Sequence, residues 1–311
     1  MDAQKKQMEE AAILYYEKKY TQHEIAQLMK LSRQTVSKLL NDAIKENIVE
    51  IKIHNPQVLC SDLEHKICSQ FHIDNAIICG VSTDNESLRQ LITVKKAADY
   101  ISPLLEKGSQ KIAISWGRTI QMLIAEFHSI SAPNNIVFPL FGATDQEETC
   151  FSSNELARSF ADRIGADVKY AWFPYCPDSI DDAELFRKTS YYKKLYDLWN
   201  SIDIAIVGIG NQNILQTFWK IFGYNEKGLS VIGDLATHFF NTDGEFVELY
   251  ENTLCASREN LKNAKQTIAI ACGDDKAEAI VGALRTQFID TLITDEYTAK
   301  KLLSCLKEHT M

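Results

Sequence analysis

The sequence of 311 residues, 45% of them hydrophobic, is long enough for a small domain followed by a larger one with a sizeable core. No apolar run approaches the ~18 residues that span a bilayer, and residues 1–10 lack the apolar segment of a signal peptide, so we expect a cytoplasmic protein. The eight cysteines form no C-x-x-C pair and match no zinc-site spacing, and we therefore expect scattered thiols, no metal and no cofactor.

Charge is distributed unevenly along the chain. The formal net charge is −9, which opposes binding to a polyanion. Residues 1–55 carry nine Lys/Arg and eight Asp/Glu, for a net charge of +1, which leaves −10 on the rest. A phosphate backbone would repel the acidic part, so we expect that part to stand away from nucleic acid or to serve another purpose.

The first predicted elements are helices with clear start signals. Apolar residues at helical spacing predict a helix over 4–19. Thr21 and Glu24 form a capping box, in which a hydroxyl and a carboxylate each bind a free backbone N–H, so a second helix begins there. Ser32 is a good N-cap for a third helix. Residues 48–53 then alternate enough to predict a short strand of the winged type.

The second and third helices have the features of a helix-turn-helix. Ala26 is small enough for a close helix crossing, and Val36 is an apolar residue placed to meet it. The turn has Lys30 where glycine is common, so a left-handed backbone there would cost on the order of 1 kcal/mol. The segment Thr21–Leu40 therefore predicts a helix-turn-helix that binds double-stranded DNA.

Polar side chains on the solvent side of the third helix are the candidates for DNA contacts. Arg33 and Gln34, near its N-terminus, are of the types that read base edges. Phosphate contacts, which position a protein without specifying a sequence, are assigned to Gln22, Ser32, Thr35, Ser37 and Lys38. A generic helical pair that makes protein contacts is the alternative. Because one DNA-binding domain carries only +1, we expect useful affinity to require two or more such domains held together by an oligomer.

A linker helix is predicted over residues 58–72. Leu59, Leu63, Ile67 and Phe71 lie four apart on one face. This stripe fits pairing with a second chain and packing on its own domain equally well. We therefore divide the chain into a DNA-binding domain (1–55), this linker (56–72) and a C-terminal domain (73–311).

Short apolar strands and helices alternate through the C-terminal domain. The predicted strands, rich in Ile and Val as strands buried on both faces should be, are 75–80, 111–115, 136–141, 168–173, 203–208, 267–272 and 291–294. The predicted helices are 86–106, 119–129, 153–164, 182–200, 275–286 and 296–307. This alternation predicts an α/β fold with a doubly wound, largely parallel sheet.

A family resemblance extends over nearly the whole chain. The segments that carry it occur in this order: Leu14–Glu17, Thr21–Ala26, Leu31–Leu40, Ser115–Thr119, Val207–Gly210, Gly233–Asp234, Asp243–Gly244, Gly273–Lys276 and Leu292–Glu296. As an ordered set they resemble the SorC-type family of sugar-responsive transcriptional regulators. The resemblance implies a sensor domain related to sugar-phosphate isomerases, assembly into dimers or tetramers, and a phosphorylated sugar effector that changes the affinity for operator DNA.

The turn after the predicted strand 111–115 has the chemistry of a phosphate cradle. Its residues place backbone N–H groups and a hydroxyl at a helix N-terminus, and they are Trp116, Gly117, Arg118 and Thr119. Gly117 lets the backbone approach a ligand, Thr119 can bond a phosphate oxygen, and Arg118 adds positive charge. An ordinary strand–helix turn is the alternative.

Further effector-binding candidates follow other strands or lie near them. Lys276, in the first turn of a helix, opposes the macrodipole, which favours an anion contact over the alternative of a solvated lysine. Asp234 would bind sugar hydroxyls, as the resemblance implies, and a structural aspartate is the alternative. The remaining candidates are residues where the backbone can approach a ligand: Gly142, Ala143, Gly208, Ile209, Gly210 and Gly273.

Two polar residues at predicted helix starts have a structural explanation. Asn154 is an effector-binding candidate that helix capping explains nearly as well. Asp295 lies where a strand meets the last helix, and we assign it to capping alone.

The sequence thus predicts a regulator of carbohydrate-metabolism genes rather than an enzyme. The first alternative is a sugar-phosphate isomerase or deaminase with a fused helical head, in which Asp234 would act as the base. The chain lacks the Asp-Gly-Ala-Asp-Glu segment expected in pentose-phosphate isomerases. The second alternative is a DNA-binding scaffold without a ligand.

Overall fold

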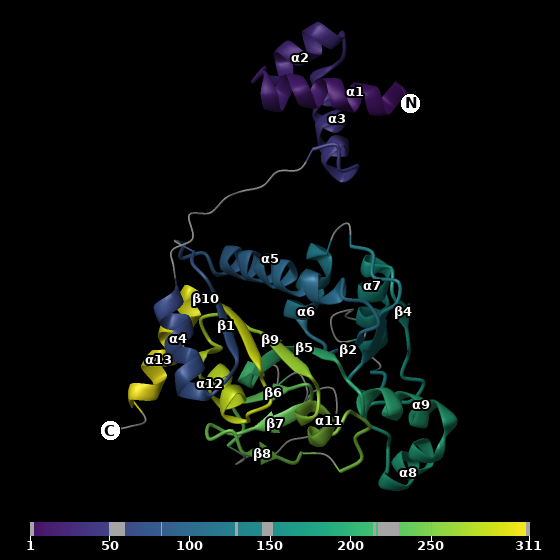
Figure 1. Cartoon of the computed structure of the whole chain (residues 1–311), viewed down its shortest axis with the longest axis vertical. Coiled ribbons are helices and arrows are strands. Elements are labelled where there is room, and N and C mark those ends of the chain that lie inside the picture. Colours follow the sequence, from purple (N-terminus) through teal and green to yellow (C-terminus); the bar gives the residue numbers. More distant parts are fainter. Residues whose placement is uncertain are drawn as a thin grey trace. The chain divides into compact units, whose positions relative to one another are not determined.

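A computed structural model describes residues 3–49, 60–81, 83–127, 130–144, 152–213, 216, 230–249 and 251–308. The chain divides into two compact units, Met1–Pro56 and Gln57–Met311. Each unit has a hydrophobic core of its own. Figure 1 shows that the first unit is helical and that the second combines helices with a sheet.

The first unit consists of α1 (Ala3–Ala12), the π-helix η1 (Ile13–Glu17), α2 (Gln22–Met29) and α3 (Arg33–Lys45). The predicted helix 4–19 therefore ends earlier than expected, because Lys19 adopts a left-handed backbone with φ 61°. The predicted capping box is confirmed, since Thr21 Oγ1 accepts from Glu24 N (3.3 Å) and the Glu24 carboxylate accepts from Thr21 N (2.8 Å). Ser32 Oγ likewise caps α3.

The turn between α2 and α3 has the predicted geometry. Ala26 and Val36 are buried together in the core of the unit. Lys30 adopts φ 54° and ψ 44°, so the left-handed turn without glycine is confirmed. The Leu31 N–H donates to the Ala26 carbonyl at 2.9 Å, which satisfies a helix-terminal acceptor. The predicted strand 48–53 lies mostly outside the described residues, and its described part, Ile48 and Val49, forms a bend.

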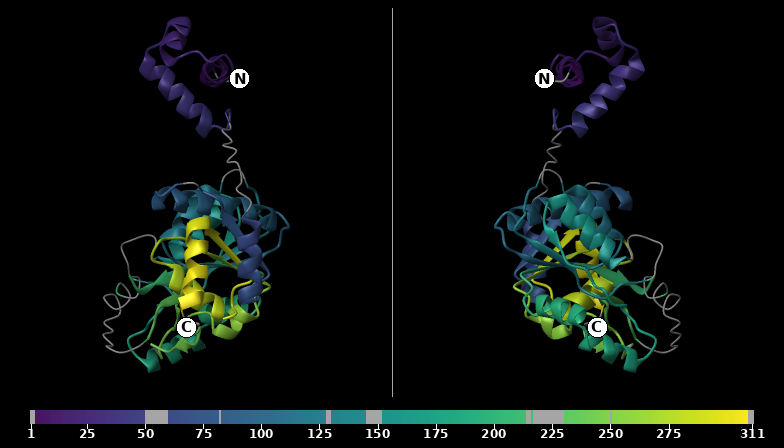
Figure 2. Two further views of the ribbon diagram at one scale, coloured as in Figure 1. Left: turned by 90° about the vertical axis from the view of Figure 1, so that its left-hand side faces the viewer. Right: turned by 90° about the vertical axis from the view of Figure 1, so that its right-hand side faces the viewer.

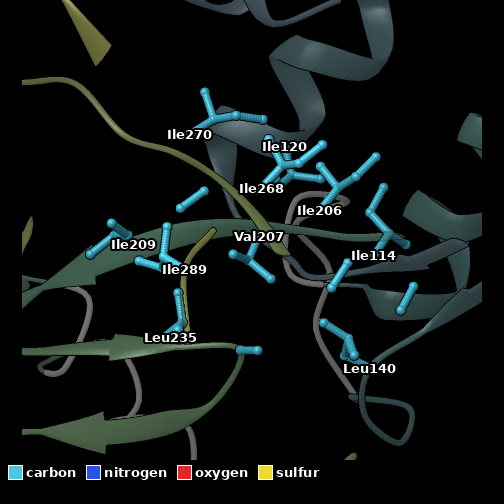
Figure 3. Packing of buried hydrophobic residues seen from close by; sticks show 14 of the residues in the cluster. Ile114, Ile120, Leu140, Ile206, Val207, Ile209, Leu235, Ile268, Ile270 and Ile289 are labelled. Carbon is cyan, nitrogen blue, oxygen red and sulfur yellow. The ribbon is translucent and has the colours of Figure 1, made fainter. Parts of the chain in front are cut away.

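The described part of the second unit contains a parallel sheet in the order β1-β10-β9-β5-β2-β3-β4. Its strands are β1 (Asn75–Cys79), β2 (Lys111–Ile114), β3 (Ile136–Pro139), β4 (Asp167–Val168), β5 (Ile204–Asn211), β9 (Gln266–Ile270) and β10 (Thr291–Asp295). Successive residues such as Ile206 and Val207 point to opposite faces and are both fully buried (Figure 3). This confirms the predicted doubly wound, largely parallel sheet.

Helices cover both faces of this sheet. One layer consists of α5 (Glu86–Leu105), α6 (Arg118–Glu126) and α7 (Ser153–Ile164), which contact one another in that order. The other layer consists of α4 (Ser61–Phe71), α12 (Ala277–Arg285) and α13 (Glu296–Glu308). Figure 2 shows α4 and α13 side by side on this second face. The stripe of α4 is thus buried within its own unit at Ile67 and Phe71.

Up to Gly208, β5 pairs in parallel with β9, and from Ile209 onward it pairs antiparallel with another strand. Its last residues pair with β6 (Gly233–Leu235), which continues into β7 (His238–Phe240) and β8 (Phe246–Val247). The prediction ended β5 at 208 and missed these three strands, because strands of two or three residues carry no periodic signal. A Cβ at Gly233 would lie 2.4 Å from the Gly210 carbonyl oxygen, so glycine is required where these strands meet.

Two further predicted elements differ from the structure. The predicted strand 168–173 does not form one continuous strand: β4 ends at Val168, because the N–H and C=O of Ala171 bond the Asn154 amide instead of a neighbouring strand. The helix 182–200 is two helices, α8 (Ile180–Lys188) and α9 (Ser190–Trp199). Thr189 separates them in an extended conformation and caps α9 through its hydroxyl.

A short helix, α11 (Arg258–Lys262), precedes β9. Within the described residues, none of the helices combines the length and the apolar character needed to cross a membrane.

Candidate functional site

The DNA-contacting residues that the sequence predicts lie on α3 and at the start of the neighbouring α2. Arg33, Gln34 and Lys38 are exposed, whereas Ser37 and Gln22 are partly buried. The Ser32 and Thr35 hydroxyls lie 2.7 Å apart at the start of α3. The predicted DNA contacts therefore lie on one exposed helix start and its flanks.

Sequence reasoning missed two polar residues on α2. His23 and Gln27 are exposed, and Gln27 Nε2 lies 3.2 Å from His23 Nε2. Their spacing of four residues, on the side of α2 away from the buried Ile25 and Ala26, is the signal that could have identified them.

A cavity of about 330 Å³ opens at the carboxyl ends of β2, β5 and β9. These strands are neighbours in the sheet, and ligand sites in open α/β sheets lie at such an edge. The structure brings these predicted effector residues to the wall of the cavity: Trp116, Gly117, Arg118, Thr119, Gly208, Ile209, Gly210, Asp234 and Lys276. Segments that are far apart in the sequence thus meet at one place.

The N-terminus of α6 forms one side of the cavity. Gly117 is its N-cap, with φ 112° and ψ 162°, a backbone conformation that favours glycine. Among the described residues, no side-chain cap is found for the first N–H groups of α6, and Arg118 and Thr119 follow Gly117 directly. Uncapped N–H groups at a helix N-terminus attract anions.

Lys276 provides a cation on the cavity wall. It is the N-cap of α12, and its Nζ donates a hydrogen bond to the Ile209 carbonyl at 2.9 Å. Burial lowers the pKa of this ammonium, while the nearby Cys272 thiol and the Asp275 and Asp234 carboxylates oppose that shift. The α12 N-terminus also has no side-chain cap, so a second helix start faces the cavity.

Asp234, in β6, is a buried carboxylate at the cavity wall. Its side chain accepts from Thr237 N at 3.2 Å and from the Trp116 indole. Burial raises its pKa to about 6, and the hydrogen bonds and Lys276 only partly offset that effect. Asp234 therefore has a structural contact, to the β6–β7 turn, and also lies on the cavity wall.

Several cavity residues were not predicted from the sequence. Asp275 accepts hydrogen bonds from the amides of Asn211 (2.7 Å) and Asn213 (2.8 Å), which joins the α12 start to the end of β5. The other unpredicted lining residues are Gln90, Ser115, Met122 and Cys272. Asp275 is adjacent in sequence to Lys276, which was predicted. A carboxylate in the same loop as that lysine is therefore the sequence feature that could have identified Asp275.

The structure places four predicted effector residues away from the cavity wall. A Cβ at Gly142 would lie 2.4 Å from the Pro174 carbonyl oxygen, and Ala143 exchanges backbone hydrogen bonds with 173–175, so both serve packing. Both ends of the Asn154 amide bond Ala171. Gly273 is not among the lining residues, and its N–H donates to Thr298 Oγ1 at 3.1 Å.

Asp295 has the predicted capping role. Its Oδ1 accepts from Thr298 N at 3.0 Å and its Oδ2 accepts from Thr298 Oγ1 at 2.6 Å. The side chain is fully buried and contributes nothing to the cavity wall.

A second cavity, of about 350 Å³, lies beside β7 and β8. Its wall includes Tyr175, His238 and Arg258. The Arg258 guanidinium is paired with Glu248 and lies over the Phe246 ring, and His238 Nε2 is 2.9 Å from the Ala256 carbonyl. Its cationic groups are thus engaged within the protein, whereas the cavity at the strand ends has two helix starts directed at it.

A helix-turn-helix unit and a ligand cavity at the strand ends of an α/β unit define a ligand-responsive transcriptional regulator. The family models agree with this division. Residues 55–304 match the sugar-binding domain family, and residues 10–46 match region 4 of sigma-70.

Known proteins with the same organisation are regulators. The sorbitol operon regulator of Klebsiella pneumoniae is 29% identical over 94% of this chain and 96% of its own. Its full-length crystal structure superposes with a TM-score of 0.76, at 28% identity, over 97% of this chain and 99% of that one. The deoxyribonucleoside regulator of Bacillus subtilis is 24% identical over 98% of this chain and 100% of its own.

The chain belongs to the SorC-type family of sugar-responsive transcriptional regulators. The prediction of this family from the ordered motifs is confirmed. These relatives are named as regulators, which supports a regulator over the alternative of an isomerase or deaminase with a fused head.

Proposed function

We propose that this protein binds operator DNA of carbohydrate-metabolism genes and that a small phosphorylated sugar, bound at the ends of β2, β5 and β9, controls its affinity for that DNA. The observation that carries the proposal is the convergence of the uncapped α6 start, Lys276 and Asp234 on one cavity. An anion and several hydroxyls are the ligand groups that these protein groups complement.

The polar groups of the cavity divide into two kinds. The α6 backbone N–H groups, Arg118, Thr119 and Lys276 are donors, and they suit a phosphate. Asp234 and Asp275 are acceptors that suit sugar hydroxyls and would repel a phosphate. We therefore infer a ligand with its phosphate at the α6 start and its hydroxyls toward these two carboxylates.

On the DNA side, we propose that Arg33 and Gln34 contact bases and that Gln22, Ser32, Thr35, Ser37 and Lys38 contact phosphates. The exposed α3 start supports this assignment, and His23 and Gln27 of α2 join the phosphate-contacting set. We further propose that the chain acts in the cytoplasm as a homodimer or homotetramer. The net charge of +1 on residues 1–55 supports an oligomer, because one DNA-binding unit neutralises few phosphates.

A thermal-shift panel tests the effector assignment. The probes are sorbitol, erythritol and deoxyribose phosphates, each beside its unphosphorylated parent and inorganic phosphate. A ligand at ~100 times its Kd should stabilise the second unit by about 2.7 kcal/mol. We expect a phosphorylated probe to shift the melting temperature more than its parent. A response to parents alone, or to no probe, refutes the phosphorylated-sugar proposal.

Matched variants connect the response to the cavity. Thr119→Val should reduce the shift that a phosphorylated probe causes, since it removes a hydroxyl at the α6 start. Thr242→Val is the control, because Thr242 is also partly buried but lies in the turn after β7, off the cavity wall. An undiminished shift in Thr119→Val removes the α6 start from the phosphate site. Gel shifts with and without the active probe then test control of DNA affinity.

A further inference from the structure

Arg89 in α5 is a buried cation that the cavity wall does not include. Its side chain is 2% exposed, and it is among the largest fully buried side chains of the described residues. Its guanidinium pairs with the Asp274 carboxylate, donates to the Thr83 carbonyl (3.3 Å) and lies over the Tyr297 ring at 4.5 Å. Its Nε is 3.4 Å from Asp295 Oδ1.

The partners of Arg89 belong to the loop that carries the cavity's cation. Asp274 lies between Gly273, whose N–H is bonded to α13, and Asp275 and Lys276, which line the cavity. Lys301 in α13 also donates to the Asp274 carbonyl. The loop 273–276 is thus held by α5 on one side and by α13 on the other.

The geometry of arginine explains why this position is occupied by that residue. A planar guanidinium can reach two carboxylates and a carbonyl at once while its face rests on a ring, which a lysine ammonium cannot do. Burying such a charge is costly unless it is paired, so the contacts to Asp274 and Asp295 are needed for the folded state. The next residue, Gln90, lines the cavity and donates to Glu86 at 2.9 Å, so the start of α5 and the loop form one wall.

We propose that Arg89 is a positioning residue for the effector cavity: through Asp274 it fixes the loop 273–276 so that Lys276 faces the ligand. This inference rests on the proposed function, because it concerns the site of the phosphorylated sugar. Arg89 touches no ligand, and its effect on affinity passes through Lys276.

Asp274→Asn separates positioning from plain electrostatics. Asp274 is partly exposed, so the variant retains most of the packing. Removing a negative charge near the cavity should by itself tighten the binding of an anion. Positioning has the opposite sign, and we expect the Kd for the phosphorylated probe to rise by about fivefold or more. Arg89→Lys keeps the positive charge but lacks the planar guanidinium that bonds several acceptors at once. We expect it also to raise the Kd for the phosphorylated probe.

Asp243→Asn is the matched control. Asp243 also faces an arginine of another element, Arg285, at 3.8 Å, but it lies off the cavity wall. Calorimetric titration with the active sugar phosphate should show an unchanged Kd for this control. If Asp274→Asn and Arg89→Lys also bind as tightly as the wild type, the positioning inference is wrong and the proposed function stands. If the wild type binds no sugar phosphate, the proposed function is wrong and the inference falls with it.

A double-mutant comparison shows whether the effect passes through the lysine. We expect Lys276→Met alone to weaken the binding of the phosphorylated probe. If Asp274 acts by placing Lys276, Asp274→Asn adds little when Lys276 is already methionine, so the combined loss is smaller than the product of the single losses. A combined loss equal to that product would assign Arg89 and Asp274 a purely structural role and overturn the proposal.

Discussion

Replacing Asp234 with asparagine removes a buried charge while it retains the shape and one acceptor oxygen. Burial raises the pKa of the carboxyl from its ordinary 3.8 to about 6, because few groups compensate the loss of water. The Thr237 N–H, 3.2 Å from the carboxylate, can bond an amide oxygen equally well. Asparagine has one acceptor for two donors, the Thr237 N–H and the Trp116 indole, so a lost hydrogen bond offsets part of the gain and the pH dependence of the difference reports the cost of the charge.

The pKa shift gives the sign and size of the effect. The folded state binds the proton more tightly than the unfolded chain, so the wild type loses stability as the pH rises from about 4 to about 6. The difference of about 2 pKa units corresponds to about 3 kcal/mol. Asparagine does not titrate, so without ligand Asp234→Asn should exceed the wild type by up to about 3 kcal/mol at pH 8 and by about half of that at pH 5.

Urea unfolding followed by far-UV circular dichroism at pH 5, 6, 7 and 8 measures this difference. Asp243→Asn is the control, since Asp243 is 79% exposed and should give no such pH-dependent gain. If the difference in stability between Asp234→Asn and the wild type is the same at pH 5 as at pH 8, the burial argument is wrong. A gain in stability with weaker binding of the sugar phosphate would show that the charge is kept for the ligand.

Three other substitutions test the two sites. Arg33→Ala should weaken operator binding by about 1–3 kcal/mol and leave the effector-induced thermal shift intact, and an unchanged gel-shift affinity would remove Arg33 from the contacts. Gly117→Ala, at φ 112° with open space around the new Cβ, should strain the turn by about 1–3 kcal/mol and raise the Kd for the sugar phosphate in calorimetry. Gly142→Ala should lower the free energy of unfolding by about 1–3 kcal/mol, because its Cβ meets the Pro174 carbonyl, while the Kd stays within about twofold. Equal effects of the two glycine variants on Kd would contradict the boundary drawn for the cavity.

Local signals explain why much of the fold could be predicted. The Thr21–Glu24 capping box and the Ser32 N-cap are interactions over three residues, so the sequence shows both partners together. The same holds for the strand β2 and the turn into α6, where apolar residues, a glycine and a helix follow one another directly. The start of α6 was therefore the best-predicted part of the cavity.

Contacts between distant segments explain what could not be predicted. Asp275 meets Asn211 across 64 residues of sequence, and Arg89 meets Asp274 across 185. Nothing near Arg89 distinguishes it from a surface arginine on an amphipathic helix, because its partners come from β-strand ends that only the sheet order brings together. The short strands β6 to β8 likewise depend on pairing with the end of β5.

The same contacts relate the cavity to the place where the second unit begins. The loop 273–276 is bonded to Thr298 in the first turn of α13, and α13 packs against α4, which begins at Ser61, close to the unit boundary at Gln57. A ligand that binds Lys276 would therefore contact a loop that is hydrogen-bonded to α5 and α13, rather than the buried strands. Close-packed strands resist small displacements, whereas helices at a face can shift as units. If the proposed effector binds at this loop, we expect the response to pass through α13 to α4, the first described helix of the second unit.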